Sequence, residues 1–415
     1  MAGSGETIVP ANNLARRLTR GFNDDMPLSE EIRERPRLLA VCYNRTLVPF
    51  LRQKIDLAFR QRTGRPLPED AVEVWHYNRL LWHLSRKGLW RYQAVESDGE
   101  EGRAKQYLAE FEHVREHQPS MLEAVSYDAI YVDEGQDFLE EDFRLIKGLC
   151  RTPTGGEPNL AIFYDDAQNL LGRVHPNWKS LGLDLQRGRR SQVMTQCFRS
   201  TRPIVEASFN ILYGRFGGSK VGVPTKLFAD VATLEEKGLI EDVGDHYEVR
   251  FAVRGGMPPR LTIAPDLREE HRLMVERLRW LVEEQRVKPE DILVLAQSWG
   301  RVVGFAKAVE SAALPSISEV HVAKTDQDRH LRRRGCLALS TVASAKGYDA
   351  YCVLMVSAND FPTDVTGRAS FHVGCTRAIE YLEVFAHQKS GLVAEMERAL
   401  GRSDRDADAG EVGSS

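Results

Sequence analysis

A pair of adjacent carboxylates follows the most strand-like segment of the chain. Residues 127–132 are largely apolar, and Asp133 and Glu134 come directly after them. Open α/β sheets bind ligands beyond the carboxyl ends of their strands, so we expect the pair at such an edge. Asp133 is suited to hold Mg²⁺, directly or through water, and Glu134 to orient or deprotonate an attacking water. An acidic loop that caps the next helix has the same composition, and this string alone does not separate the two interpretations.

The first seven residues, Met1-Ala-Gly-Ser-Gly-Glu-Thr7, read as a phosphate-binding loop that has lost its lysine. In the pattern G-x-x-x-x-G-K-[ST], backbone N–H groups cradle phosphates, the Lys reaches the β/γ-phosphates and the Ser/Thr holds Mg²⁺. Gly5 and Thr7 fit, but Glu6 stands where the Lys belongs, and a carboxylate there repels a triphosphate. Short Gly/Ser turns are common, so this match has weight only beside other motifs.

Further strings follow in a fixed order along the chain. A second strand-like run ends in acidic residues and Gln168. Arg199 stands at the start of a predicted helix, and two later strings contain Lys346-Gly347 and Arg377. Each string alone has a structural explanation, such as a helix cap, a solvated arginine or a turn. Five strings in this order do not.

Together the strings resemble the superfamily 1 DNA helicases of the UvrD/Rep type, over residues 3–385. The resemblance implies an α/β protein of two RecA-like domains, with parallel sheets covered by helices and a nucleotide cleft between them. It implies ATP-driven translocation on single-stranded DNA with 3′–5′ unwinding, and ATP and Mg²⁺ as cofactors. The implied partners are single-stranded DNA or DNA junctions.

The resemblance also assigns roles to single residues. Nucleotide binding falls to Gly3, Ser4, Gly5, Thr7 and Asp349, and the metal to Thr7 and Asp133. The catalytic roles fall to Glu134, Gln168, Arg199 and Arg377. The DNA contacts fall to Tyr43, Asn44, Trp75 and His76. The two arginines are expected across the cleft from the carboxylates, because a permanent charge on a planar fork fits phosphate oxygens.

The chain departs from the family pattern at several positions besides Glu6. Pro10 falls in the first turns of the helix expected after the loop, where it removes a hydrogen bond unless it lies at the very start. Ala343 replaces a histidine, and Leu171 and Arg173 stand where family members place aromatic residues that stack on bases. The strand expected before the loop is missing. Two alternatives therefore stay open: a non-catalytic DNA-binding helicase remnant, and a fragment of a longer helicase.

Composition limits the class of protein and the partners that the chain can have. The chain has 415 residues, 42% of them hydrophobic and 28% charged, as expected for a globular protein of two or three domains. The net charge of −4 means that nucleic-acid binding needs a local basic groove. Candidates are two clusters, Arg187, Arg189 and Arg190, and Arg332, Arg333 and Arg334. The six scattered cysteines are expected to be buried thiols, and without a membrane span or a signal sequence we expect a cytoplasmic protein with no membrane partner.

Periodicity predicts the elements that must position these residues. Strands are expected at Arg37–Tyr43, Tyr127–Asp133, Leu160–Tyr164, Asp291–Ala296, Cys336–Thr341 and Tyr351–Ser357. Helices are expected at Thr46–Phe59, Glu141–Leu149, Arg202–Leu212 and His271–Gln285, and a β-hairpin within His246–Pro265 around Gly255-Gly256. Trp82 and Trp90 are expected in the core, with Trp75 undecided. The simplest division is a first domain at 1–196, a second at 197–400 and a disordered polar tail at 401–415.

Overall fold

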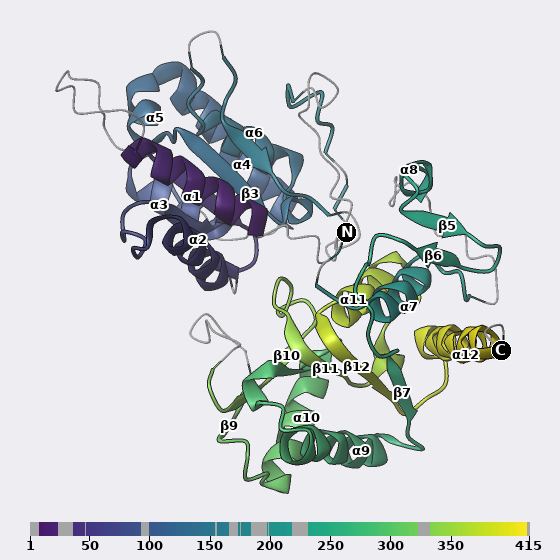
Figure 1. Cartoon of the computed structure of the whole chain (residues 1–415). Helices are drawn as coiled ribbons and strands as arrows, with labels where there is room; N and C mark the ends of the chain where they lie inside the picture. Colours follow the sequence, from purple (N-terminus) through teal and green to yellow (C-terminus); the bar gives the residue numbers. More distant parts are fainter. Residues whose placement is uncertain are drawn as a thin grey trace. The chain divides into compact units, whose positions relative to one another are not determined.

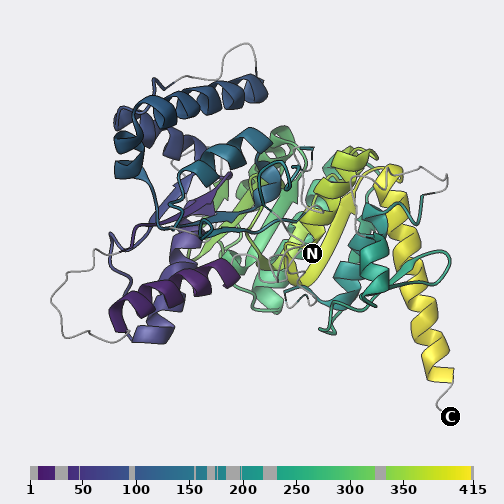
Figure 2. The same ribbon diagram turned by 90° about the horizontal axis from the view of Figure 1, so that it is seen from above.

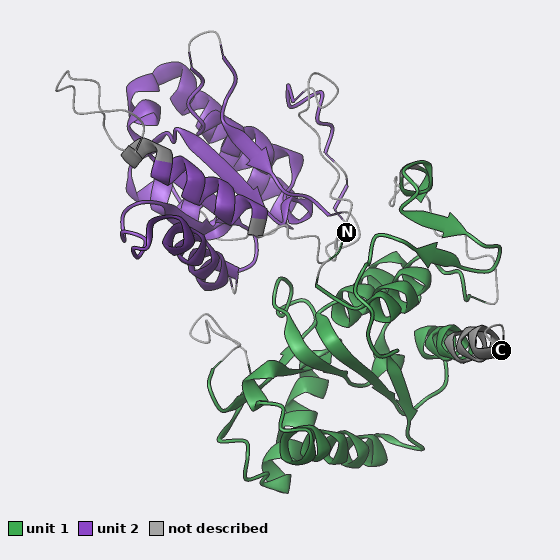
Figure 3. Cartoon of the chain, viewed as in Figure 1, with its two compact units in different colours: residues 1–4, 166–172, 194–415 green, residues 5–165, 173–193 purple. Residues whose placement is uncertain are grey.

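The computed structural model of the chain contains two compact α/β units (Figure 3). Unit 2 comprises residues 5–165 and 173–193, and unit 1 comprises residues 1–4, 166–172 and 194–415. The residues that the structure describes are 8–23, 36–45, 47–92, 99–153, 156–165, 173–174, 176–183, 197, 199–217, 231–322 and 333–412. No helix in these ranges is both long and apolar enough to span a membrane.

Unit 2 is built on a four-stranded parallel sheet with the order β2-β1-β3-β4. Its strands are β1 (Leu38–Cys42), β2 (Glu73–His76), β3 (Ala129–Asp133) and β4 (Leu160–Ile162). Its helices are α1 (Ile8–Asn23), α2 (Leu47–Thr63), α3 (Tyr77–Arg86), α4 (Gly99–His117), α5 (Pro119–Val125), the 3₁₀ turn η1 (Gly135–Asp137) and α6 (Glu140–Gly148).

Helices cover both faces of this sheet (Figure 1). Alternate residues of β1 point to opposite faces: Leu38 and Ala40 pack with α1 and α2, whereas Leu39 and Val41 pack with α3 to α6. A parallel sheet buried on both faces reads as a continuous apolar run, which is why β1 and β3 were recognisable from the sequence.

Unit 1 contains a six-stranded parallel sheet with the order β7-β12-β11-β8-β10-β9. Its strands are β7 (Arg260–Ile263), β8 (Ile292–Ala296), β9 (Glu319–Val322), β10 (Cys336–Thr341), β11 (Ala350–Met355) and β12 (Ala378–Ala386). An antiparallel pair, β5 (Ile240–Asp242) and β6 (Tyr247–Val249), stands apart from it.

The helices of unit 1 also lie on both sides of its sheet (Figures 1 and 2). One side carries α9 (Leu267–Arg279), which continues into a π-helical turn (Trp280–Glu284), and α10 (Trp299–Ala312). The other side carries α7 (Arg202–Leu212) and α11 (Val365–Cys375), with α12 (Gly391–Val412) packed against α7. The remaining short elements are α8 (Val231–Glu236), the 3₁₀ turn Pro289–Asp291 and the 3₁₀ turn Ala358–Asp360.

The fold class, α/β with parallel sheets flanked by helices, is confirmed. The predicted hairpin is wrong, because the antiparallel pair lies earlier, at β5 and β6, and β7 joins the large sheet parallel to β12. Gly255-Gly256 is not a hairpin turn; instead, the chain passes so close to Thr201 that a Cβ on Gly256 would lie 2.3 Å from the Thr201 Cγ2 atom.

Four further expectations can be compared with the structure. Pro10 lies in the first turn of α1 as described, where N–H groups have no partner within the helix and proline removes no bond. Helix α12 continues to Val412, into the polar stretch for which composition indicates disorder. Trp90 is in the core as predicted, but Trp82 is not: 36% of it is exposed, because it lies on the outer face of α3. All six cysteines are buried free thiols, as expected.

Candidate functional site

The adjacent carboxylates lie where the chain leaves the carboxyl end of β3. Asp133 is the last residue of the strand, and Glu134 adopts a left-handed backbone conformation with φ 54° and ψ 47°. Residues other than glycine rarely adopt this conformation, and when they do it is often at a functional site. It turns the chain sharply into η1, and both Asp133 and Glu134 are buried.

Gly135 brings this turn against β4. The Gly135 N–H donates to the Phe163 carbonyl at 2.7 Å, and a Cβ at Gly135 would lie 2.9 Å from the Ile162 Cγ2 atom. The close approach of the two backbones therefore requires a residue without a side chain.

Gln136 fixes the orientation of Glu134. Its Nε2 donates to the Glu134 carboxylate at 2.6 Å, and its Oε1 accepts from the Asp165 N–H at 2.9 Å. All three residues are buried, with Gln136 fully so. One side-chain amide thus ties the end of β3 to the segment that follows β4.

The end of β1 lies directly beside these carboxylates. Cys42 is the register partner of Asp133, and its thiol has a pKa raised well above the ordinary value, first by burial and then by the charges of Asp133 and Glu134. The thiol therefore stays protonated, and its environment is that of a structural cysteine rather than a nucleophile.

The predicted DNA-contact residues share this carboxyl edge of the sheet. Tyr43 and Asn44 follow β1, and Trp75 and His76 end β2. The Tyr43 ring packs edge-on against Phe138, with ring centroids 5.5 Å apart. The structure thus brings Tyr43, Asn44, Trp75, His76, Asp133 and Glu134 to one edge.

Several of these side chains are held by neighbours that the sequence did not indicate. Arg173 lies over the Tyr43 ring, 5.6 Å from its centroid, and donates to its hydroxyl at 3.1 Å. Trp75 donates its indole N–H to Glu73 at 3.0 Å, and His76 accepts the Arg79 N–H at 3.3 Å, which caps α3. Arg173 therefore packs on the ring of Tyr43 at this edge.

In unit 1 the structure brings together Arg199, Asp349 and Arg377. Arg199 and Asp349 form an ion pair, with Nε 2.9 Å from Oδ2, and both side chains are partly exposed. Asp349 and Arg377 immediately precede Ala350 and Ala378, which are register partners in β11 and β12. The three residues therefore gather at the amino ends of these two strands.

Arg377 is fully buried. Its Nε donates to the Val373 carbonyl at 3.1 Å, and its Nη1 lies 3.5 Å from the Tyr348 carbonyl. The Arg377 carbonyl in turn accepts the Ala350 N–H at 3.0 Å. Arg377 thereby links the end of α11 to the starts of both strands.

Arg254 is a residue of this region that the sequence analysis missed. Its guanidinium donates to the Arg199 carbonyl at 2.5 Å and to Glu380 at 2.8 Å, and its own carbonyl accepts the Arg202 N–H. Arg254 therefore fixes the backbone on which Arg199 stands. Its neighbours Gly255-Gly256 were the available signal, but they indicated a turn.

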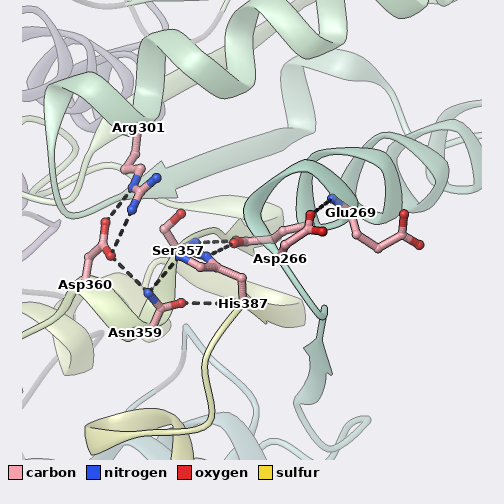
Figure 4. Close-up of polar contacts among 8 residues, drawn as sticks. Asp266, Glu269, Arg301, Ser357, Asn359, Asp360 and His387 are labelled. Carbon is pink, nitrogen blue, oxygen red and sulfur yellow. Dashed lines mark hydrogen bonds and ion pairs between the residues drawn. The ribbon is translucent and has the colours of Figure 1, made fainter.

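The carboxyl edge of the larger sheet carries a separate polar network (Figure 4). Buried Glu270 accepts from His387 Nδ1 at 2.6 Å and from the Ser357 N–H at 2.5 Å, and burial raises its pKa. Asn359 lies between His387 and Asp360 and hydrogen-bonds to both, and Asp360 accepts from Arg301 at 2.6 Å. These side chains satisfy one another, so the network joins the ends of β11 and β12 to α9 and α10.

Several predicted site residues lie outside the described residues. They are Gly3, Ser4, Gly5, Glu6, Thr7, Gln168, Arg187, Arg189, Arg190 and Arg332. Within the described ranges, no group of three or more His, Cys, Asp or Glu side chains is arranged to hold a metal ion. A magnesium site at Asp133 would therefore need ligands from elsewhere, such as Thr7 and the phosphates of a bound nucleotide.

Comparisons with known proteins find structural similarity at low scores. No protein-family model and no curated protein matches the chain. The structure of S. cerevisiae Dbp5 bound to RNA and ADP BeF3 is similar over 97% of this chain and 82% of that chain, with 11% identity and a TM-score of 0.46. The C-terminal domain of a possible DNA helicase from Lactobacillus plantarum is similar over 49% of this chain and 96% of that chain, with 16% identity and a TM-score of 0.34. At these scores neither similarity bears on activity.

Proposed function

We propose that the chain is a nucleic-acid-dependent ATPase of the helicase class, of the UvrD/Rep type that moves 3′–5′ along single-stranded DNA. The observation that carries the proposal is the carboxylate pair at the end of β3. Asp133 and Glu134 are buried side by side at the sheet edge where α/β proteins bind ligands, and Gln136 orients Glu134. Buried carboxylates are costly, and a site that keeps two of them adjacent is suited to a cation and a water.

The roles proposed for the nucleotide side rest on this geometry for Asp133 and Glu134, and on the sequence motifs for the other residues. Asp133, with Thr7, would hold Mg²⁺, which when bound neutralises charge on the phosphates of ATP. Glu134 would orient the attacking water, since its hydrogen bond from Gln136 leaves the carboxylate in a fixed position. Gln168 would contact the γ-phosphate, and Gly3, Ser4 and Gly5 would cradle the phosphates.

Unit 1 would supply the cations. Arg199 and Arg377 are proposed to stabilise the phosphates, with Asp349 next to the ribose. The Arg199–Asp349 ion pair supports this assignment for Arg199, because an acidic partner orients a guanidinium that is still partly exposed. A strand of nucleic acid would contact Tyr43, Asn44, Trp75 and His76 at the carboxyl edge of the smaller sheet.

Glu6 favours a second candidate, a nucleic-acid-binding protein that has lost hydrolysis. The lysine that it replaces neutralises charge on the β/γ-phosphates, and loss of one such contact commonly costs about 10²–10³-fold in rate. Glutamate adds a repulsive charge at the same place. We therefore expect the chain to bind single strands and to hydrolyse ATP weakly.

The test compares the parent with Glu6→Lys, and adds Glu134→Gln to the Glu6→Lys protein. Phosphate release is measured with Mg²⁺-ATP, with and without single-stranded DNA or RNA. We expect the lysine to raise DNA-stimulated release by about 10²–10³-fold and Glu134→Gln to abolish that gain. Glu123→Gln, an exposed carboxylate on α5, is the matched control and should change nothing.

The outcomes separate the candidates. A parent and a Glu6→Lys protein that bind oligonucleotides but never hydrolyse ATP establish the non-catalytic binder. Hydrolysis that survives Glu134→Gln contradicts the role given to the carboxylate pair. The direction is tested with an active protein on duplexes that carry a 3′ or a 5′ single-stranded tail, and unwinding from the 5′ tail contradicts the UvrD/Rep type.

A further inference from the structure

Helix α3 exposes an aromatic and basic face. Its inward side chains, Tyr77, Leu80, Leu81 and Leu84, are buried in the core of unit 2. Its outward side includes Arg79, Trp82 and Arg86, which lie three and four residues apart and therefore on one stripe of the helix. Tryptophan is highly buried on average, yet 36% of Trp82 is exposed. We call these three residues the α3 face.

The α3 face is strongly basic in a chain that is acidic overall. Residues 77–91 include Arg79, Arg86, Lys87 and Arg91 and contain no Asp or Glu, whereas the whole chain carries a net charge of −4. Neither Arg79 nor Arg86 forms an ion pair within the part of the chain that the structure describes. The positive charge of this surface is therefore not neutralised locally, which suits a polyanionic partner.

The two arginines flank the exposed ring. The guanidinium of Arg79 lies over Trp82 at 4.1 Å from the ring centroid, and that of Arg86 lies at 6.0 Å. These cation–π contacts place two permanent charges next to the indole. Proteins that bind single-stranded nucleic acid combine aromatic rings that stack on bases with cations that follow the backbone.

The α3 face is continuous with the segment proposed to contact nucleic acid. Helix α3 begins at Tyr77, directly after His76. The Trp75 ring stacks on His83 of the second turn, with centroids 5.4 Å apart and an interplanar angle of 25°. A strand lying on Trp75 and His76 can therefore extend along α3, whose residues 77–86 include no Asp or Glu.

We propose that the α3 face binds single-stranded nucleic acid, with Trp82 stacked on a base and Arg79 and Arg86 on neighbouring phosphates. The inference rests on the proposed nucleic-acid-dependent function and adds a contact surface beyond the carboxyl edge. A single strand is the expected occupant rather than a duplex, because bases paired within a duplex do not offer a free face to Trp82.

The test measures the binding of a fluorescein-labelled single-stranded oligonucleotide by anisotropy at several salt concentrations. Trp82→Ala should weaken binding about tenfold, and Trp82→Phe should keep most of the affinity because it retains a ring. Arg79→Ala/Arg86→Ala should reduce the slope of log affinity against log salt by about 1.4, since each phosphate contact on a single strand contributes about 0.7. Thermal unfolding of each variant confirms that it is folded.

Arg52→Ala/Arg62→Ala is the matched control, because it removes two exposed arginines from α2 of the same unit. It should leave both affinity and salt slope near those of the parent. If the Trp82→Ala variant binds the oligonucleotide as tightly as the parent does, the α3 proposal is overturned and the proposed function still stands. A parent that binds no nucleic acid at all overturns both, and points to a protein partner for the α3 face.

Discussion

A buried ion pair joins α11 to α12, and substitution of one partner would leave the other charge without its counter-ion. Arg368 and Glu395 are 2% and 5% exposed, and they form two parallel bonds, Nη1 to Oε2 at 2.8 Å and Nη2 to Oε1 at 2.6 Å. The Arg368 guanidinium also donates to the Ile211 carbonyl of α7 at 2.6 Å and to the Thr363 carbonyl at 2.9 Å. One side chain thus connects three helices of unit 1.

The magnitude of the perturbation follows from this burial. Arg368→Ala leaves the Glu395 carboxylate buried without its cation, and removal of one partner of a buried pair costs about 3–5 kcal/mol. For a unit of this size, each kcal/mol shifts the melting temperature by roughly 2–4 °C, so the expected loss is about 6–20 °C. Arg368→Met combined with Glu395→Leu should recover most of it, because apolar side chains of similar volume carry no desolvation cost.

Two assays measure the stability: thermal unfolding monitored by circular dichroism, and unfolding by urea titration. Arg272→Ala is the control, because Arg272 pairs with Glu269 and Glu276 on the exposed side of α9 and solvent screens such pairs. An Arg368→Ala protein with the same melting temperature as the parent refutes the reasoning. So does a double variant that melts as low as the single one, since the loss then comes from packing rather than from an uncompensated charge.

Two further predictions concern unit 2. Gly135→Ala should destabilise it by about 1–3 kcal/mol in urea unfolding, because the added Cβ would lie 2.9 Å from Ile162 and 3.0 Å from the Phe163 carbonyl. Gly255→Ala, where a Cβ meets nothing within 4 Å, is its control, and equal stability of the two variants would contradict the prediction. Burial raises the pKa of Asp142 to about 6, above the ordinary value near 3.9, so the folded state binds this proton more tightly than the unfolded state. The free energy of unfolding should therefore fall as pH rises from about 4 to about 6, and Asp142→Asn should remove this fall. An Asp142→Asn protein with the same pH profile as the parent would contradict this prediction.

The central strands of both sheets could be predicted because burial on two faces leaves a continuous apolar run. β1, β3, β8, β10 and β11 all fall at or within two residues of the predicted bounds. β7 was misassigned because Arg260-Leu-Thr-Ile263 alternates in polarity, which is equally typical of a hairpin strand. Only its pairing with β12, more than a hundred residues later, decides its place.

The candidate site could be predicted where a motif lies at the end of a strand. Asp133 and Glu134 lie where the sequence placed them, at the end of β3, whereas the ion pair between Asp349 and Arg199 was not predicted. What periodicity cannot give is the contact between distant segments. Glu270 and His387 are separated by 117 positions, and neither belongs to a motif that would mark the pair.

The residues proposed for the site lie at the carboxyl edge of one sheet and at the amino ends of two strands of the other. In unit 2 the carboxylates follow the carboxyl end of β3, whereas in unit 1 Arg377 follows the carboxyl end of α11. The unsatisfied carbonyls at such a helix end favour a cation, and Arg377 donates to the Val373 carbonyl of the last turn. This arginine therefore has a structural role in α11 that is independent of any ligand.

Because of this structural role, substitutions of Arg377 and of Arg199 test different things. Substitution of fully buried Arg377 removes a helix-capping hydrogen bond together with any contact to phosphate, so lost activity would have two causes. Arg199 is partly exposed and pairs with a partly exposed Asp349, so its guanidinium can be removed with less disturbance of the core. The informative pair of variants is thus Arg199→Ala with Arg199→Lys. A phosphate contact that depends on the planar fork is lost in both, whereas a simple requirement for positive charge is met by lysine.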